Sequence, residues 1–122
     1  MATIDVKSDE FEKLIEDNSI VFVDFWAAWC GPCRSFAPVY EAASQTHTDA
    51  VFAKVDTEAE QELAAAAGIT SIPTLMAFRD GILLFRQPGA LPANSLEELI
   101  SAIKSADMEA IRKEIAETAS KK

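Results

Sequence analysis

The two cysteines of this chain, Cys30 and Cys33, are the residues whose spacing points most directly to chemistry. They follow the apolar run at 20–25, which predicts a buried strand, and they precede residues 34–47, which predict a helix. Thiols at positions i and i+3 near a helix start share one face and lie close enough to form a disulfide. Reaction sites of open α/β sheets gather where a strand ends, so the pattern predicts a redox site at this junction.

The sequence places Cys30 at the cap of this helix, as the more exposed thiol, and Cys33 one turn further in. The partial positive charge of a helix N-terminus favours a thiolate, but it contributes only about 0.3–1 kcal/mol. Lowering the pKa of a thiol from about 8.5 to near 7 requires roughly 2 kcal/mol. Hydrogen bonds to Cys30 must therefore supply the remainder, and the Cys33 S–H group and nearby backbone N–H groups are the candidate donors.

This asymmetry between the two thiols predicts disulfide exchange in two steps. The Cys30 thiolate attacks a disulfide of a partner protein to give a mixed disulfide, and Cys33 then attacks Cys30 and releases the reduced partner. The alternatives are a static disulfide and half of a metal site. A bridge that closes so short a loop stabilises little. Zinc usually needs four ligands, and the chain offers two cysteines and one distant histidine, His47, so no metal site is predicted.

The elements that must position this pair can be read from periodicity and turn signals. Four further segments have the pattern of strands: 3–6, 51–56, 74–78 and 82–86. The first helix is predicted after Ser8, and capping boxes predict two later helix starts, at Thr57 with Glu60 and at Ser95 with Glu98. Asp80-Gly81 between the last two strands predicts a hairpin. The fold is therefore expected to be α/β, with a sheet that begins parallel and becomes antiparallel at one edge.

Composition narrows the classes of partner. The net charge is −9, and the acidic excess lies in the first half of the chain. Such a charge argues against a nucleic-acid partner. It is expected to keep the exposed helix faces solvated; the alternative is that it attracts partners with basic surfaces. No apolar run approaches the ~20 residues needed to span a bilayer, so no membrane association is expected. The opening residues lack the basic-then-apolar pattern of a signal peptide, which favours a cytoplasmic location.

Three features together resemble the thioredoxin family: Trp-Ala-Ala-Trp-Cys-Gly-Pro-Cys at 26–33, Asp24 six residues before Cys30, and Ile-Pro-Thr at 72–74. The resemblance extends from about Ile4 to Lys104. It implies the thioredoxin fold, in which a central five-stranded mixed sheet is flanked by about four helices. Residues 1–105 would form this domain, and residues 106–122 would be a short C-terminal helical extension of the same domain.

The resemblance also assigns two polar residues behind the cysteines. Asp24 would be the general base for Cys33, and Lys54 matches the family lysine near that aspartate. The residues themselves support part of this, because a carboxyl group within an apolar strand should have a raised pKa. The alternative is a tolerated polar residue that points to the other face of the sheet.

A docking face is implied by the same resemblance. The family proline matching Pro73 is cis, although an isolated X-Pro bond is usually trans. The backbone before it pairs with substrate as a short added strand. The residues implied to form this mostly apolar face are Trp29, Gly31, Pro32, Ile72, Pro73, Gly89 and Ala90, whereas Trp26 is expected in the core.

The sequence departs from the family pattern at three places. Arg34 stands where lysine is common, and Pro88 precedes Gly89 where a β-branched residue is usual. Beyond Lys104, a stripe of Met108, Ile111 and Ile115 predicts a helix starting near Asp107. This helix is expected to pack on its own domain or to fray; the alternative is a contact for a partner or a second copy.

The resulting prediction is a monomeric protein-disulfide reductase. The resemblance implies no bound cofactor; electrons would come from NADPH through a flavoprotein, thioredoxin reductase, and pass to disulfide-containing cytoplasmic proteins. Two rival functions remain. One is a thiol oxidant or isomerase, because a difference of 30 mV in redox potential between a reductant and an oxidant corresponds to only about 1.4 kcal/mol. The other is a redox-inactive scaffold that binds a partner.

Overall fold

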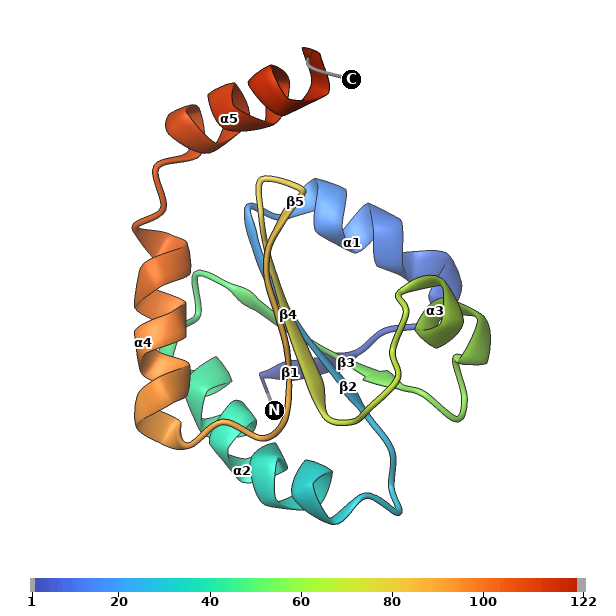
Figure 1. Ribbon diagram of the computed structural model, residues 1–122. Coiled ribbons are helices and arrows are strands. Elements are labelled where there is room, and N and C mark those ends of the chain that lie inside the picture. The colour runs from blue at the N-terminus through green and yellow to red at the C-terminus, as the bar shows by residue number, and fades with distance from the viewer. Residues whose placement is uncertain (1, 121–122) are drawn as a thin grey trace.

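Five strands form one mixed sheet in the computed structural model, which describes residues 2–120 (Figure 1). The strands are β1 (Thr3–Asp5), β2 (Ile20–Trp26), β3 (Val51–Asp56), β4 (Thr74–Arg79) and β5 (Ile82–Pro88). Their spatial order is β1-β3-β2-β4-β5. The first three run parallel, whereas β4 is antiparallel to β2 and β5 is antiparallel to β4. The predicted α/β class and mixed sheet are confirmed.

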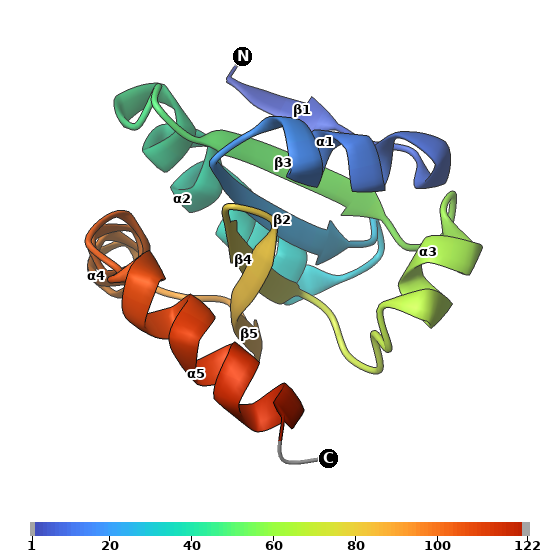
Figure 2. The same cartoon turned by 90° about the horizontal axis from the view of Figure 1, so that it is seen from above.

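Helices cover both faces of this sheet (Figures 1 and 2). They are the 3-10 helix η1 (Ser8–Glu10), α1 (Phe11–Asp17), α2 (Gly31–Thr46), α3 (Gln61–Ala66), α4 (Ala93–Lys104) and α5 (Met108–Ser120). One hydrophobic cluster joins α2 and α4 to one face, and a second joins α1 and α3 to the other. No helix within residues 2–120 is long and apolar enough to cross a membrane.

Strand β2 lies at the centre of both clusters because its side chains alternate between the two faces. Phe22 belongs to the cluster under α2, and its ring stacks on Phe52 of β3 with centroids 4.9 Å apart. Tyr40 of α2 packs edge-on against Phe52, and its hydroxyl donates a 2.8 Å hydrogen bond to the Ala53 carbonyl. These contacts fix α2 against the sheet and set where its N-terminus lies.

The turn between β4 and β5 agrees with the sequence. Asp80 and Gly81 have φ angles of 53° and 81°. Positive φ at both central residues is what a type I′ hairpin turn requires, and Asp-Gly is a favoured pair for it.

Three helix starts differ from the prediction. Ser8 lies within η1, and α1 itself begins at Phe11. Helix α3 begins at Gln61 rather than after Thr57, because the Thr57 hydroxyl donates to the carbonyl of Trp26 (3.0 Å) instead of capping a helix. Helix α4 begins at Ala93, directly after Pro92, before the predicted cap at Ser95. Tertiary contacts and proline geometry thus override the local capping signals.

Helix α5 confirms the helix predicted near Asp107, but it stands away from the sheet (Figure 1). The Asp107 carboxylate accepts a hydrogen bond from the Ala110 N–H group (3.0 Å). Met108 is buried, whereas Ile115 at the end of the apolar stripe is 48 % exposed. The Arg112 guanidinium reaches Asp80 of the β4–β5 turn at 2.8 Å. The helix is therefore held mainly at its first turns.

Truncation after Ala106 should lower the free energy of unfolding by only about 1.5–3 kcal/mol, since Met108 is the one side chain of α5 that is buried. Met108→Ala in the full chain should reproduce most of that loss, whereas Ile115→Ala should change little. Urea denaturation of the three variants checks this. A truncated chain that fails to unfold cooperatively would contradict it.

Candidate active site

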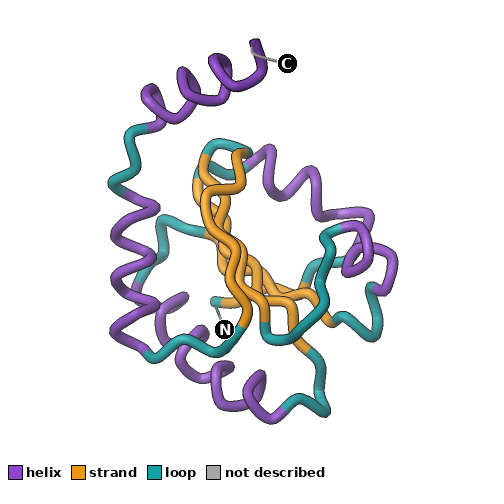
Figure 3. Tube along the Cα trace, viewed as in Figure 1, coloured by secondary structure: helices purple, strands orange, loops and turns teal. Residues whose placement is uncertain are grey.

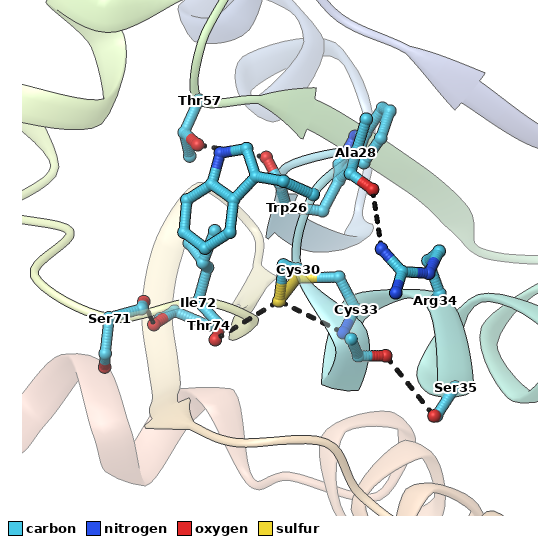
Figure 4. Close-up of a disulfide and its surroundings, with 12 residues drawn as sticks. Trp26, Ala28, Cys30, Cys33, Arg34, Ser35, Thr57, Ser71, Ile72 and Thr74 are labelled. Atoms are coloured by element: carbon cyan, nitrogen blue, oxygen red, sulfur yellow. Dashed lines mark hydrogen bonds between the residues drawn. A yellow bond between two sulfur atoms is a disulfide. The ribbon is translucent and has the colours of Figure 1, made fainter.

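Cys30 and Cys33 form a disulfide at the start of α2, with their Cα atoms 5.2 Å apart (Figure 4). Cys30 is the N-cap residue of α2, in extended backbone geometry, and Gly31 and Pro32 form the first helical positions. Pro fits there because the first N–H groups of a helix have no partner within it. The Cys33 N–H group donates to Cys30 Sγ at 3.2 Å. The predicted cap position and one predicted backbone donor are both confirmed.

The two cysteines differ in surroundings more than in exposure. The exposed fraction is 4 % for Cys30 and 3 % for Cys33, so the prediction that Cys30 is the more exposed thiol holds by a small margin only. Cys30 borders a surface groove, and Cys33 is not among the residues that line it. The carbonyl oxygen of Ile72 lies 3.7 Å from Cys30 Sγ, and the Ile72–Pro73 peptide bond is cis, as the resemblance implied. Access to the disulfide therefore comes from the groove, at Cys30.

This groove has a volume of about 460 Å³. Its lining residues come from three segments: Trp29, Cys30, Gly31 and Pro32; Thr57 and Ala64; and Ile69, Thr70, Ser71 and Ile72. Trp29 is 68 % exposed, and its indole N–H donates to the Glu58 carboxylate at 2.7 Å. The structure thus brings four predicted docking residues together at one groove.

Gly89 and Ala90, also predicted for docking, do not line the groove. They are exposed, and the Gly89 N–H group donates to the Pro73 carbonyl at 2.7 Å. Gly89 has a φ of 102°, which residues with a side chain rarely adopt. The end of β5 is thereby held next to the cis-proline.

Asp24 lies on β2, and its exposed fraction is 1 %. Alternation along β2 places it on the face covered by α2, with Phe22, and Lys54 of β3 is its register partner. Neither carboxyl oxygen has a hydrogen-bond partner. Burial raises the pKa of Asp24 from 3.8 to about 7, although the Lys54 charge opposes this rise. A carboxyl group poised near neutral pH is suited to proton transfer.

Lys54, the register partner of Asp24, also contacts the ring of Trp26. The Lys54 ammonium lies 4.7 Å from the centre of the Trp26 ring, a distance typical of cation–π contacts. Trp26 is half-buried and packs against the cluster of Ala27, Cys30 and Cys33, in agreement with its predicted place in the core.

His47 lies away from the cysteines, at the C-terminal end of α2. Its Nε2 atom is 2.7 Å from the Glu97 carboxylate, and its Nδ1 atom is 2.8 Å from the Lys104 ammonium. Residues 2–120 contain no group of three His, Cys, Asp or Glu side chains arranged to hold a metal ion.

Sequence reasoning missed several residues of the site. The sequence identifies only the charge of Arg34, yet its guanidinium donates to the Ala28 carbonyl (2.9 Å) and so braces the loop before Cys30. Glu58 and residues 69–71 were also missed. The Ile-Pro-Thr motif directly after residues 69–71 was the available signal, but nothing local shows that this segment lies against the start of α2.

Comparison with known proteins agrees with this geometry. Residues 2–102 match the family model "Thioredoxin". The chain is 49% identical over 116 residues to "Putative thioredoxin 2" of Streptomyces coelicolor, an alignment covering 95% of this chain and 87% of that protein. It is 39% identical over 103 residues to a thioredoxin of Alicyclobacillus acidocaldarius, which covers 84% of this chain and 98% of that protein. A Plasmodium falciparum thioredoxin structure superposes with a TM-score of 0.76 at 39% identity, over 85% of this chain and 99% of that one.

The fold and the cysteine pair define a protein-disulfide oxidoreductase. The chain belongs to the thioredoxin family, and its activity is the reduction of protein disulfides through the redox-active pair Cys30–Cys33.

Asp24→Asn should stabilise the protein more as pH rises. Because the folded-state pKa of Asp24 is raised to about 7, the favourable contribution of its protonated form is complete below pH 3.8 and is lost as pH rises through about 7. The variant avoids that loss, so its gain in unfolding free energy should be small at pH 4 and reach up to about 4 kcal/mol at pH 8. Urea denaturation between pH 4 and pH 8 measures it, with exposed Asp9→Asn as the control. An equal gain at both pH values would rule out the raised pKa.

Proposed function

We propose that Cys30 is the attacking thiolate and Cys33 the resolving thiol in the reduction of protein disulfides. The observation that carries this assignment is that Cys30 borders the groove and accepts the Cys33 N–H bond. The Cys30 thiolate forms a bond to one substrate sulfur, and the other substrate sulfur leaves as a thiolate. The Cys33 thiolate then attacks Cys30 Sγ and displaces the substrate sulfur that is bonded to it, which leaves as the second thiolate. The dithiol is oxidised to the Cys30–Cys33 disulfide, and the substrate gains two thiols.

Asp24 acts as the general base for Cys33 in the resolving step. Its carboxyl group lies on the α2 face and is half-ionised near pH 7, so it accepts the Cys33 proton without a large penalty. Lys54 lowers the pKa of this carboxyl group through its charge. Lys54 is thus a positioning residue for the proton transfer.

Protein substrates dock across the groove and the cis-proline. An extended substrate segment would pair with the backbone of Ile72 before Pro73. The apolar surfaces of Trp29 and Pro32, and the bare backbone of Gly31, leave room for substrate beside Cys30. Gly89 and Ala90 complete the docking face on the Pro73 side.

The protein works as a cytoplasmic monomer with no resident cofactor. NADPH supplies electrons through a flavoprotein, thioredoxin reductase, which returns the Cys30–Cys33 disulfide to the dithiol. The cytoplasmic location is supported by cysteine use: both cysteines of this chain belong to the redox pair, which leaves none for the structural disulfides common in oxidising compartments. The domain spans residues 1–105 and its helical extension residues 106–122, of which residues 1, 121 and 122 lie outside the part of the chain that the structure describes. Sedimentation of the reduced chain at a mass near 13.3 kDa would check the monomer.

The native chain should catalyse reduction of insulin disulfides with dithiothreitol and, separately, with NADPH plus thioredoxin reductase. Cys30→Ser should abolish catalysis with both donors because no thiolate remains at the groove. Cys33→Ser should instead accumulate a mixed disulfide with substrate, seen as a mass increase that dithiothreitol reverses. Turbidity of precipitating insulin measures the rate.

Activity with dithiothreitol but not with NADPH plus thioredoxin reductase would contradict the proposed electron source and leave the proposed disulfide exchange intact. Retained activity in Cys30→Ser would overturn the assignment of the attacking thiolate. Failure of Cys33→Ser to trap substrate would remove Cys33 from the resolving role.

Asp24→Asn should slow resolution of the mixed disulfide by about 10²-fold at pH 7, the lower end of what a general base typically contributes. The attack of Cys30 should remain nearly unchanged. In the native chain the resolution rate should rise as Asp24 ionises through about pH 7, and the variant should lose this rise. Stopped-flow kinetics of the reduced proteins separates the two steps, with Asp9→Asn as the control. Equal resolution rates in both variants would refute the assignment.

A further inference from the structure

Arg86, on strand β5, contacts the end of helix α3. Its Nη1 atom donates to the Ala67 carbonyl, and its Nη2 atom donates to the Gly68 carbonyl at 2.6 Å. Two successive backbone carbonyls therefore share one guanidinium group, which comes from a strand 18 residues further along the chain. The side chain is exposed, so these bonds are made at the surface rather than in the core.

The end of α3 requires such a partner. The last carbonyl groups of a helix lack partners within it. Gly68, with a φ of 68°, ends the helix in the left-handed region, and its N–H group donates to Ala65. That turn satisfies N–H groups but not the carbonyls of Ala67 and Gly68, which Arg86 occupies with the paired donors of its planar group. A Cβ atom on Gly68 would lie 3.4 Å from Arg86 Nη2, an ordinary contact, so glycine is favoured here by its positive φ rather than by the approach of Arg86.

The residues directly after this contact form one side of the groove beside Cys30. We name residues 69–72, all four of which line the groove, the wall segment. It belongs to the loop between α3 and β4 (Figure 3). At its far end the Thr74 hydroxyl donates to the Ser71 carbonyl at 2.7 Å. The wall segment therefore has one anchor from β4 after it and one anchor, Arg86, from β5 before it.

We propose that Arg86 is a positioning residue for the docking of protein substrates. By binding the Ala67 and Gly68 carbonyls it holds the wall segment, and with it the Ile72 backbone, at a fixed distance from Cys30. The inference rests on the docking of protein substrates in the groove proposed above. A small disulfide that reaches Cys30 directly does not need the wall, so Arg86 selects for protein substrates over small ones without touching the sulfur chemistry.

Arg86→Met keeps much of the side-chain length but removes both donors. Arg112→Met is the matched control, since it removes the same charge from an exposed ion pair with Asp80. Both variants turn over insulin with dithiothreitol as the electron donor, and their reduced forms react with 5,5′-dithiobis(2-nitrobenzoate) under stopped flow. Arg86→Met should raise KM for insulin roughly two- to tenfold with kcat nearly unchanged, the range that one or two net hydrogen bonds supply. The rate with the small disulfide should not change, Arg112→Met should match the native chain, and Arg86→Lys should lie between.

Amide hydrogen exchange measured by NMR tests the contact apart from activity. Exchange at Ala67, Gly68 and Ile69, whose N–H groups donate within this turn, should accelerate in Arg86→Met and not in Arg112→Met. Unchanged exchange would overturn the role of Arg86 in holding the wall. Faster exchange with an unchanged KM for insulin would overturn its role in docking. Equal losses with both disulfides would overturn the selectivity for protein substrates.

Trp29→Ala separates failure of this inference from failure of the docking proposal. If Trp29→Ala raises KM for insulin and Arg86→Met does not, docking at the groove stands and the role of Arg86 is overturned. If neither variant changes KM for insulin, the groove is not the docking site, and both proposals fall together.

Discussion

The packing of α2 on the centre of the sheet is the constraint on which the site depends. The rings of Phe22, Phe52 and Tyr40 meet beneath α2, and the Tyr40 hydroxyl bonds to the Ala53 carbonyl. An aromatic contact of this kind buries a large apolar area and allows few alternative arrangements. Since the helix is rigid, fixing its middle also fixes its N-terminus, and the N-terminus carries both sulfurs. The position of the redox pair is therefore set by the packing of α2 in the core.

The same layer contains a group that opposes stability. Asp24 is buried without a hydrogen-bond partner, and its raised pKa records the free energy needed to ionise it there. An apolar residue of similar size would suit β2 better if stability were the only demand. A proton acceptor whose pKa lies near neutral pH, however, must be partly desolvated. Folding stability and proton transfer therefore compete for this one position.

Access to the sulfurs depends on segments that are distant in the sequence. The loop before α2, the region from β3 into α3 and the wall segment meet only because β2, β3 and β4 are neighbours in the sheet. Side chains outside the groove hold these segments: Arg34 bonds to Ala28, Glu58 bonds to Trp29, and Arg86 bonds to the end of α3. The redox pair itself lies within residues 30–33, whereas the surface that receives a substrate is assembled from distant segments only when the chain has folded.

The sequence by itself determined the redox pair at the start of α2, the mixed sheet, the Asp-Gly hairpin and the burial of Asp24, because each follows from spacing or periodicity within a short segment. It did not determine the starts of α3 and α4, since Thr57 bonds to Trp26 across the fold and Pro92 sets where α4 begins. The cis bond at Ile72–Pro73 came from family resemblance, as local preference favours trans. The similar exposure of the two cysteines, the groove and the contacts of Arg34 and Arg86 were decided by the tertiary structure alone. They join residues whose proximity exists only after the strands have paired.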